Sequence, residues 1–241
     1  MSSAAAELPN QNATIPIIMT DSAVTETGIR AAALRVLAAR ERLNARRIIL
    51  TLLISVLVVP ICVVAIGSGL GLIALPQEMF ELASRSPILF PAHMVCSALA
   101  LLMAPVVLAA RRRPNYHRPL GRLLGVFVVI GGLTALPVAV LSHSPLGARS
   151  GFFVQGLTWL SLLLAGIRSI RRRDVELHAR LMLAMVAVTT GAVWFRILTG
   201  GAIVLGLPFD DVYIGAAWAG WMVPLAIVAA RPRLSAGLLA R

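Results

Sequence analysis

Residues 89–143 read LFPAHMVCSALALLMAPVVLAARRRPNYHRPLGRLLGVFVVIGGLTALPVAVLSH. Two apolar runs, 89–110 and 122–142, are separated by a short basic segment that begins with three arginines at 111–113. Each run is close to the ~20 residues that an α-helix needs to cross the hydrocarbon of a bilayer. Arginines at the end of such a run are typical of a helix that stops at the membrane interface. This stretch therefore predicts two transmembrane helices joined by a basic turn.

The same pattern recurs along the chain and predicts the fold. Hydrophobic residues make up 59% of the 241 residues and charged residues only 13%, whereas about a quarter of the residues of a soluble domain are charged. We therefore expect an all-α fold, a six-helix transmembrane bundle that occupies residues 48–230. The six apolar segments are 48–74, 89–110, 122–142, 151–168, 180–200 and 212–230.

The segments that flank the bundle are polar or basic. Residues 1–27 are polar and rich in Ser, Ala, Thr and Asn, so we expect a disordered tail. They lack the basic and compact apolar regions of a signal peptide. Residues 28–47 alternate apolar residues with arginines. This alternation predicts a basic amphipathic helix that lies on an anionic membrane surface. Residues 231–241 form a short tail after the last span.

The arginines also predict the orientation of the bundle. All 22 basic residues are arginines, and the net charge is +12. With six spans, alternate loops place nearly all of them, and both termini, on one side. That side is expected to be cytoplasmic and to contact anionic lipid, in addition to the lipid bilayer itself. Because the arginines cluster at the ends of apolar segments, nucleic acid is not expected as a partner.

The four histidines lie at two predicted levels. His93 and His143 are placed at the outer ends of the second and third spans, and His117 and His178 beside the basic inner loops. Imidazole is the usual axial ligand of haem b, and helix bundles are a usual place for it. We therefore predict a haem b site, with His117 and His178 as the inner metal ligands. The alternative is that these histidines are simply amphipathic residues at the interface.

Two charged residues complete the candidate cofactor-binding set of His93, His117, His143, Asp174, His178 and Arg196. Asp174 precedes His178 by one helical turn, where a carboxylate can orient the ring or can simply begin a solvated helix. Arg196 lies within the fifth span, where a cation is costly unless it is paired or reaches the interface. It can pair with a haem propionate or a lipid phosphate, or extend outward past Thr199.

Other features point to packing and narrow the choice of chemistry. Gln155 and Trp159 are one turn apart in the fourth span and are expected to form interhelical hydrogen bonds. Cys62 and Cys96 both fall in apolar segments and are expected to be free. The sequence has no hydrolase triad, Walker loop, dinucleotide fingerprint or zinc-motif spacing. The spans contain no Asp or Glu, so a carboxylate proton relay is not expected, and enzymatic activity is left open.

Two loop motifs resemble those of a known family. Residues 117–122, HRPLGR, resemble an H-R-x-x-G-R signature, and residues 172–182 resemble R-R-x-D-x-x-x-H-R-x-W-M, with Ala179 and Leu181 in place of Arg and Trp. Together with His93, these motifs resemble the DUF2306 family of predicted bacterial membrane proteins. The resemblance implies a multi-pass protein of the bacterial inner membrane and implies no activity.

Two functional hypotheses remain open at this point. The first is a haem-binding or quinone-linked redox protein. The second is a non-enzymatic membrane component, such as an assembly factor or a small-molecule permease.

Overall fold

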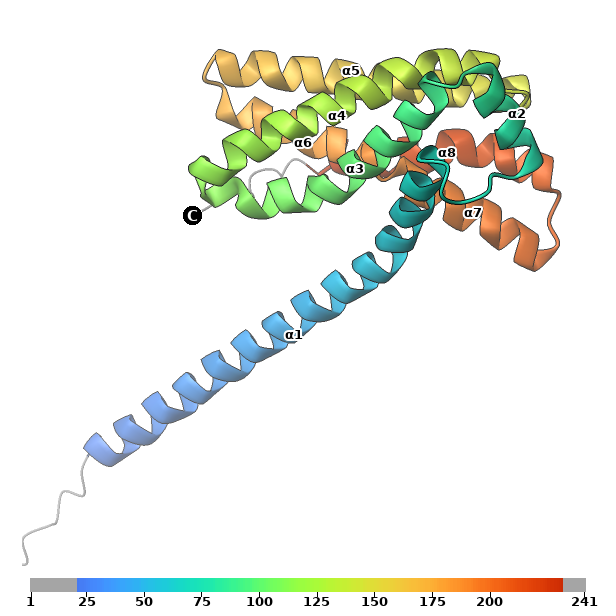
Figure 1. The fold of residues 1–241 in the computed structure, drawn as a ribbon. Helices are drawn as coiled ribbons and strands as arrows, with labels where there is room; N and C mark the ends of the chain where they lie inside the picture. The colour runs from blue at the N-terminus through green and yellow to red at the C-terminus, as the bar shows by residue number, and fades with distance from the viewer. Residues whose placement is uncertain (1–20, 232–241) are drawn as a thin grey trace, which may run out of the picture. The chain divides into compact units, whose positions relative to one another are not determined.

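The computed structural model describes residues 21–231, and all regular structure in this range is helical (Figure 1). The predicted all-α fold is therefore confirmed. The elements are α1 (Asp21–Gly69), α2 (Gln77–Arg85), α3 (Leu89–Ala109), the short 3-10 helix η1 (Ala110–Arg112), α4 (Pro114–Leu141), α5 (Leu146–Arg171), α6 (Val175–Thr189), α7 (Gly191–Leu205) and α8 (Phe209–Ala229).

The chain divides into two compact units, residues 1–53 and residues 54–241. In the first unit the predicted amphipathic segment 28–47 is helical, and α1 begins earlier, at Asp21, inside the predicted tail. The position of this segment on the membrane surface stays a prediction. Residues 1–20 and 232–241, which hold most of the two predicted tails, lie outside the described residues.

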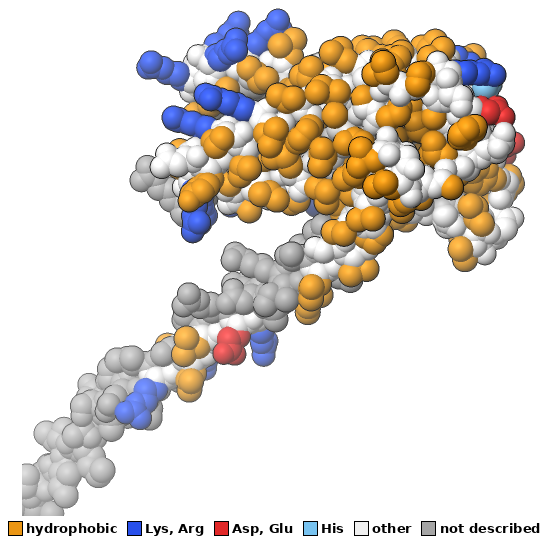
Figure 2. Space-filling view, in the orientation of Figure 1, with side chains coloured by type: hydrophobic (Ala, Val, Ile, Leu, Met, Phe, Trp, Pro, Cys, Tyr) orange, Lys and Arg blue, Asp and Glu red, His pale blue; other side chains and the backbone are white. Residues whose placement is uncertain are grey.

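The second unit contains five of the six predicted spans and all but the first residues of the other, 48–74. Five helices of the described chain are long and apolar enough to cross a membrane, and a shorter apolar helix, Ser55–Gly69, precedes them at the end of α1. The five spans are Leu89–Arg112, Pro114–Leu141, Leu146–Arg171, Val175–Leu205 and Phe209–Ala229. Large hydrophobic side chains cover the surface of the bundle (Figure 2). The chain therefore folds as the transmembrane helical bundle that the apolar segments predict.

Close helix packing holds the bundle together. Lipid tails are as apolar as leucine, so membrane helices associate mainly through van der Waals contact, and small residues allow their backbones to approach. Gly220 of α8 illustrates this, because an added Cβ would lie 3.2 Å from the Phe195 backbone nitrogen of α7. The largest core cluster joins α3, α4, α5, α6 and α8 through Ala100, Val107, Leu124, Val128, Trp159, Leu163, Met185, Val188 and Trp221.

Two elements differ from the predicted segments. The loop between the first two spans contains α2, a short helix whose Leu82 is buried while Glu81 is exposed. The predicted fifth span is divided into α6 and α7, with Thr190 as the junction between them.

Charged residues separate to the two ends of the bundle. Figure 2 shows most of the visible arginines of the bundle gathered at one end, and acidic side chains, with a basic side chain and a histidine beside them, at the other. The basic end contains the turns from α3 to α4 and from α5 to α6, and the start of α8 carries Asp210 and Asp211. This is the separation that the predicted topology requires.

Candidate functional site

His93 lies inside the bundle rather than at its surface. Its Nδ1 is 2.9 Å from the carbonyl oxygen of Gly131 in α4. Helix α4 continues for ten residues after Gly131, to Leu141, which at about 1.5 Å per residue is about 15 Å. The predicted outer layer of His93 and His143 is therefore not formed. The prediction measured depth along α3 alone, whereas α4 extends well beyond the level of His93.

A small polar group surrounds the His93 ring. Ser97 Oγ lies 3.4 Å from the His93 Nδ1. Thr134 Oγ1 donates to the Ile130 carbonyl at 2.6 Å and lies 3.1 Å from the Gly131 carbonyl. Gly131 is required for this approach, because an added Cβ would lie 2.9 Å from Ser97 Oγ and 3.3 Å from the ring of Trp159. A glycine thus brings α3 and α4 close enough for an imidazole on one helix to reach the backbone of the other.

The same geometry recurs at two further histidines. His117 of α4 places its Nδ1 3.1 Å from the Val107 carbonyl of α3, and His178 of α6 places its Nδ1 2.9 Å from the Gly166 carbonyl of α5. Both histidines follow a turn with three consecutive arginines, 111–113 and 171–173. Each histidine joins its own helix to the last two turns of the preceding helix.

These hydrogen bonds assign a proton to one ring nitrogen. A carbonyl oxygen only accepts, so Nδ1 carries a proton in His93, His117 and His178. No hydrogen bond involves these Nε2 atoms within the described part of the chain. In that same part, Trp221 Nε1 is the sole buried side-chain nitrogen or oxygen without a partner.

His143 has a different environment. Its exposed ring accepts a hydrogen bond at Nε2 from Arg85 Nη1, at 2.6 Å. This contact connects α2 to the segment that follows α4. Because Nε2 is already engaged, His143 does not share the open nitrogen of the other three histidines.

Asp174 caps α6 and does not orient the His178 ring. Its Oδ1 accepts a hydrogen bond from Leu177 N at 2.9 Å, as a carboxylate at the N-terminus of a helix commonly does. The His178 Nδ1 donates instead to the carbonyl of Gly166. Of the two roles considered for Asp174, the structure displays the helix start.

Arg196 lies near the middle of the bundle and is exposed on its side. Its neighbour Phe195 packs against Gly220, which is eleven residues from the start of α8 and nine from its end. The guanidinium turns back along α7 and donates from Nη1 to the Ala192 carbonyl at 2.9 Å. It therefore does not extend outward past Thr199.

The two cysteines lie in α1 and α3. The Cys62 thiol is buried and donates to the Ala98 carbonyl at 3.5 Å. Both cysteines are free, as predicted.

The junction between α6 and α7 adds further polar groups in the bundle interior. Trp159 Nε1 donates to Thr189 Oγ1 at 2.9 Å, and Gln155 Nε2 donates to the Val188 carbonyl at 3.3 Å. The interhelical hydrogen bonds predicted for Gln155 and Trp159 are confirmed. A helix interrupted inside a membrane bundle is a common element of binding sites. The pair Thr189 and Thr190, polar in an otherwise apolar run, was the sequence signal for this junction.

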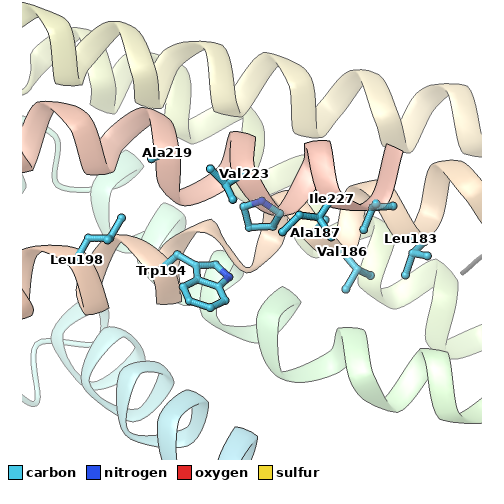
Figure 3. Close-up of a pocket in the computed structure, with 10 residues that line it drawn as sticks. Leu183, Val186, Ala187, Trp194, Leu198, Ala219, Val223 and Ile227 are labelled. Atoms are coloured by element: carbon cyan, nitrogen blue, oxygen red, sulfur yellow. The ribbon is translucent and has the colours of Figure 1, made fainter. Parts of the chain in front are cut away.

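Two grooves open on the side of the bundle. The first, of about 490 Å³, is lined by α6, α7 and α8, and its walls are apolar (Figure 3). The second, of about 440 Å³, lies between α1 and α7 and is lined by Val56, Leu57, Pro60, Ile61, Arg196, Ile197, Gly200 and Gly201. The second groove contains a charged side chain, and the first does not.

A metal site made of protein ligands alone and a haem site differ in the number of protein ligands that they need. Within the described residues, no group of three or more His, Cys, Asp or Glu side chains is arranged to hold a metal ion. Haem iron needs only one or two protein ligands, because the porphyrin supplies the rest. Separate histidines with an open Nε2 are compatible with such a group.

Comparison with known proteins identifies the family. No curated protein and no solved structure matches the chain. The family model for predicted membrane proteins designated DUF2306 matches residues 90–230, which is more than half of the chain and covers α3 to α8. The protein therefore belongs to the DUF2306 family of predicted membrane proteins.

Proposed function

We propose that this protein is a haem-binding, quinone-linked redox protein of the bacterial cytoplasmic membrane, with His93, His117 and His178 as the haem ligands. The observation that supports it is the shared geometry of the three rings. In each, Nδ1 donates to a helix carbonyl and Nε2 is left open.

This geometry is the one that metal-bound histidines adopt. A ligating imidazole usually donates its other ring N–H to a carbonyl, a carboxylate or water, which fixes the tautomer and the ring orientation. Haem b supplies one-electron chemistry when bound. Two of the ligands, His117 and His178, lie next to arginine-rich turns, and arginine pairs well with carboxylates such as the haem propionates.

The proposal also includes the orientation of the bundle in the membrane. The arginine-rich end of the bundle faces the cytoplasm, together with the N- and C-termini, and contacts anionic lipid. Cytoplasmic loops of membrane proteins carry an excess of Lys and Arg, and juxtamembrane basic residues are attracted to anionic headgroups. The separation of charge in Figure 2 supports this orientation.

The second candidate is a non-enzymatic membrane component, and the same hydrogen bonds support it. His117 joins α4 to α3, and His178 joins α6 to α5. In this alternative the imidazoles only fasten pairs of helices, and the open Nε2 atoms have no role.

One substitution separates the two candidates. His178→Asn keeps an N–H group near the position of Nδ1, so it can still donate to the Gly166 carbonyl, but it has no counterpart of Nε2. His178→Ala removes both groups. The measurement is the reduced-minus-oxidised absorption spectrum of purified protein expressed with ample haem precursor, together with the thermal unfolding temperature.

A redox protein should show a Soret band that both variants weaken, while only His178→Ala loses stability. A helix-fastening role predicts a colourless protein in which His178→Asn behaves as the wild type. His143→Asn is the control, because its Nε2 is engaged by Arg85, and it should leave the spectrum unchanged. A folded, colourless wild-type protein would rule out the haem proposal.

A further inference from the structure

We propose that the groove between α1 and α7 binds the head group of an isoprenoid quinone, with Arg196 as the hydrogen-bond donor to a quinone carbonyl. The inference rests on the quinone-linked half of the proposed function and names the site at which the quinone is bound.

The first argument is the depth of Arg196 in the membrane. Its neighbour Phe195 packs against Gly220 near the middle of α8, and α8 is 21 residues long, about the thickness of the hydrocarbon. Arg196 is therefore close to the bilayer midplane. A cation at this depth is costly, and such residues commonly mark ligand sites.

The second argument is the kind of residues that line the groove. Apart from Arg196, its walls are aliphatic residues of α1 and α7, with Gly200 and Gly201 beside them. A Cβ added at either glycine would have no atom within 4 Å, so both face open space. An apolar groove with one strong donor fits an amphiphile with an apolar chain and an oxygen-bearing head.

The depth also selects between possible head groups. A phospholipid phosphate resides at the headgroup level, about 15 Å from the midplane. The guanidinium turns toward Ala192 rather than toward the outer end of α7, where Asp210 and Asp211 follow. A quinone head is uncharged and dissolves in the hydrocarbon, so it reaches Arg196 without moving a charge into the membrane.

Direct binding of a quinone tests this site without any haem signal. The wild-type protein is placed in nanodiscs of phosphatidylcholine that contain no quinone, and decylubiquinone is titrated by calorimetry. Arg196→Gln removes the charge, and the loss of one charge-assisted hydrogen bond should weaken binding about tenfold. Gly200→Leu fills the groove and should abolish binding.

Gly215→Leu is the matched control for the glycine substitution. Gly215 also has no atom within 4 Å of an added Cβ, but it does not line the groove. This variant should bind decylubiquinone as the wild type does. A folded Gly200→Leu variant that binds normally would overturn the proposal.

The other possible occupants give distinct results. The same titration with oleate, and lipid analysis of the purified protein, examine an anionic head group. Oleate or phospholipid binding that depends on Arg196, with no quinone binding, would replace the proposed occupant. Quinone binding by a colourless protein would leave this site standing while the haem ligands of the proposed function fail, and a haem spectrum without quinone binding would do the reverse.

Discussion

The imidazole of His93 is held 2.9 Å from the carbonyl oxygen of Gly131, a residue of α4 at which an added Cβ would lie 2.9 Å from Ser97 Oγ. The hydrogen bond and the close approach of the two helices therefore depend on the same glycine. This pairing places a histidine in the interior of a membrane bundle with its ring orientation fixed, and it makes the bundle sensitive to a single methyl group.

Gly131→Ala should destabilise the protein. The new methyl group would crowd Ser97 and Trp159, and overpacking of this kind costs about 1–3 kcal/mol. Thermal unfolding in detergent measures the effect. Gly125→Ala is the control on the same helix, because its Cβ would meet only Leu163, at 3.9 Å. Equal stability of the two variants would contradict the close contact at Gly131.

Trp159→Phe should lower the free energy of unfolding by about 1 kcal/mol, because interhelical hydrogen bonds in membranes contribute about 0.6–1.7 kcal/mol. The substitution removes the donor to Thr189 Oγ1 and keeps most of the ring. A double-mutant cycle with Thr189→Val isolates the hydrogen bond from the loss of packing. Additive effects of the two substitutions would show that the pair is not coupled.

Asp174→Ala should destabilise α6 by about 1 kcal/mol, the usual effect of losing a side-chain cap. Asp174→Asn should have little effect, because an amide oxygen can still accept from Leu177 N. Neither variant should change an absorption spectrum attributed to His178, since that ring is held by Gly166. A spectral change in Asp174→Asn would mean that the carboxylate acts on the ring.

Reporter fusions test the proposed topology. Fusions that end after Arg113 and after Arg173 should report a cytoplasmic location, and a fusion after Gly147 should report a periplasmic one. The turns that contain Arg113 and Arg173 are rich in arginine, and cytoplasmic loops of membrane proteins carry an excess of Lys and Arg. A periplasmic signal at Arg113 or Arg173 would reverse the orientation.

The sequence predicted the helices better than the contacts of the site. Apolar runs of membrane length leave little choice of secondary structure, and the runs 89–110 and 212–230 correspond closely to α3 and α8. Gln155 and Trp159 were also recognisable, because polar groups in an apolar span need partners. Helix rise gives depth only along one helix, so it misplaced His93 relative to α4.

Partners across helices were harder to predict. The spacing of Asp174 and His178 suggested a contact on one helix face, but the deciding partner was the carbonyl of Gly166 on another helix. Backbone carbonyls are present at every residue, so no residue type marks the one that is used. The groove beside Arg196 likewise depends on how α1 packs against α7.

The histidine contacts that close the two hairpins have a consequence for biogenesis. His117 bonds to a residue ten positions earlier, and His178 to one twelve positions earlier. Membrane helices insert first and associate afterwards, and contacts between near neighbours in sequence need little loop closure. The histidine hydrogen bond of each helix pair can therefore form as soon as the second helix of the pair enters the bilayer, while the remainder of the chain is still being synthesised. The protein would then be assembled from two helix pairs, α3–α4 and α5–α6, with α7 continuing the span of α6 and α8 added last.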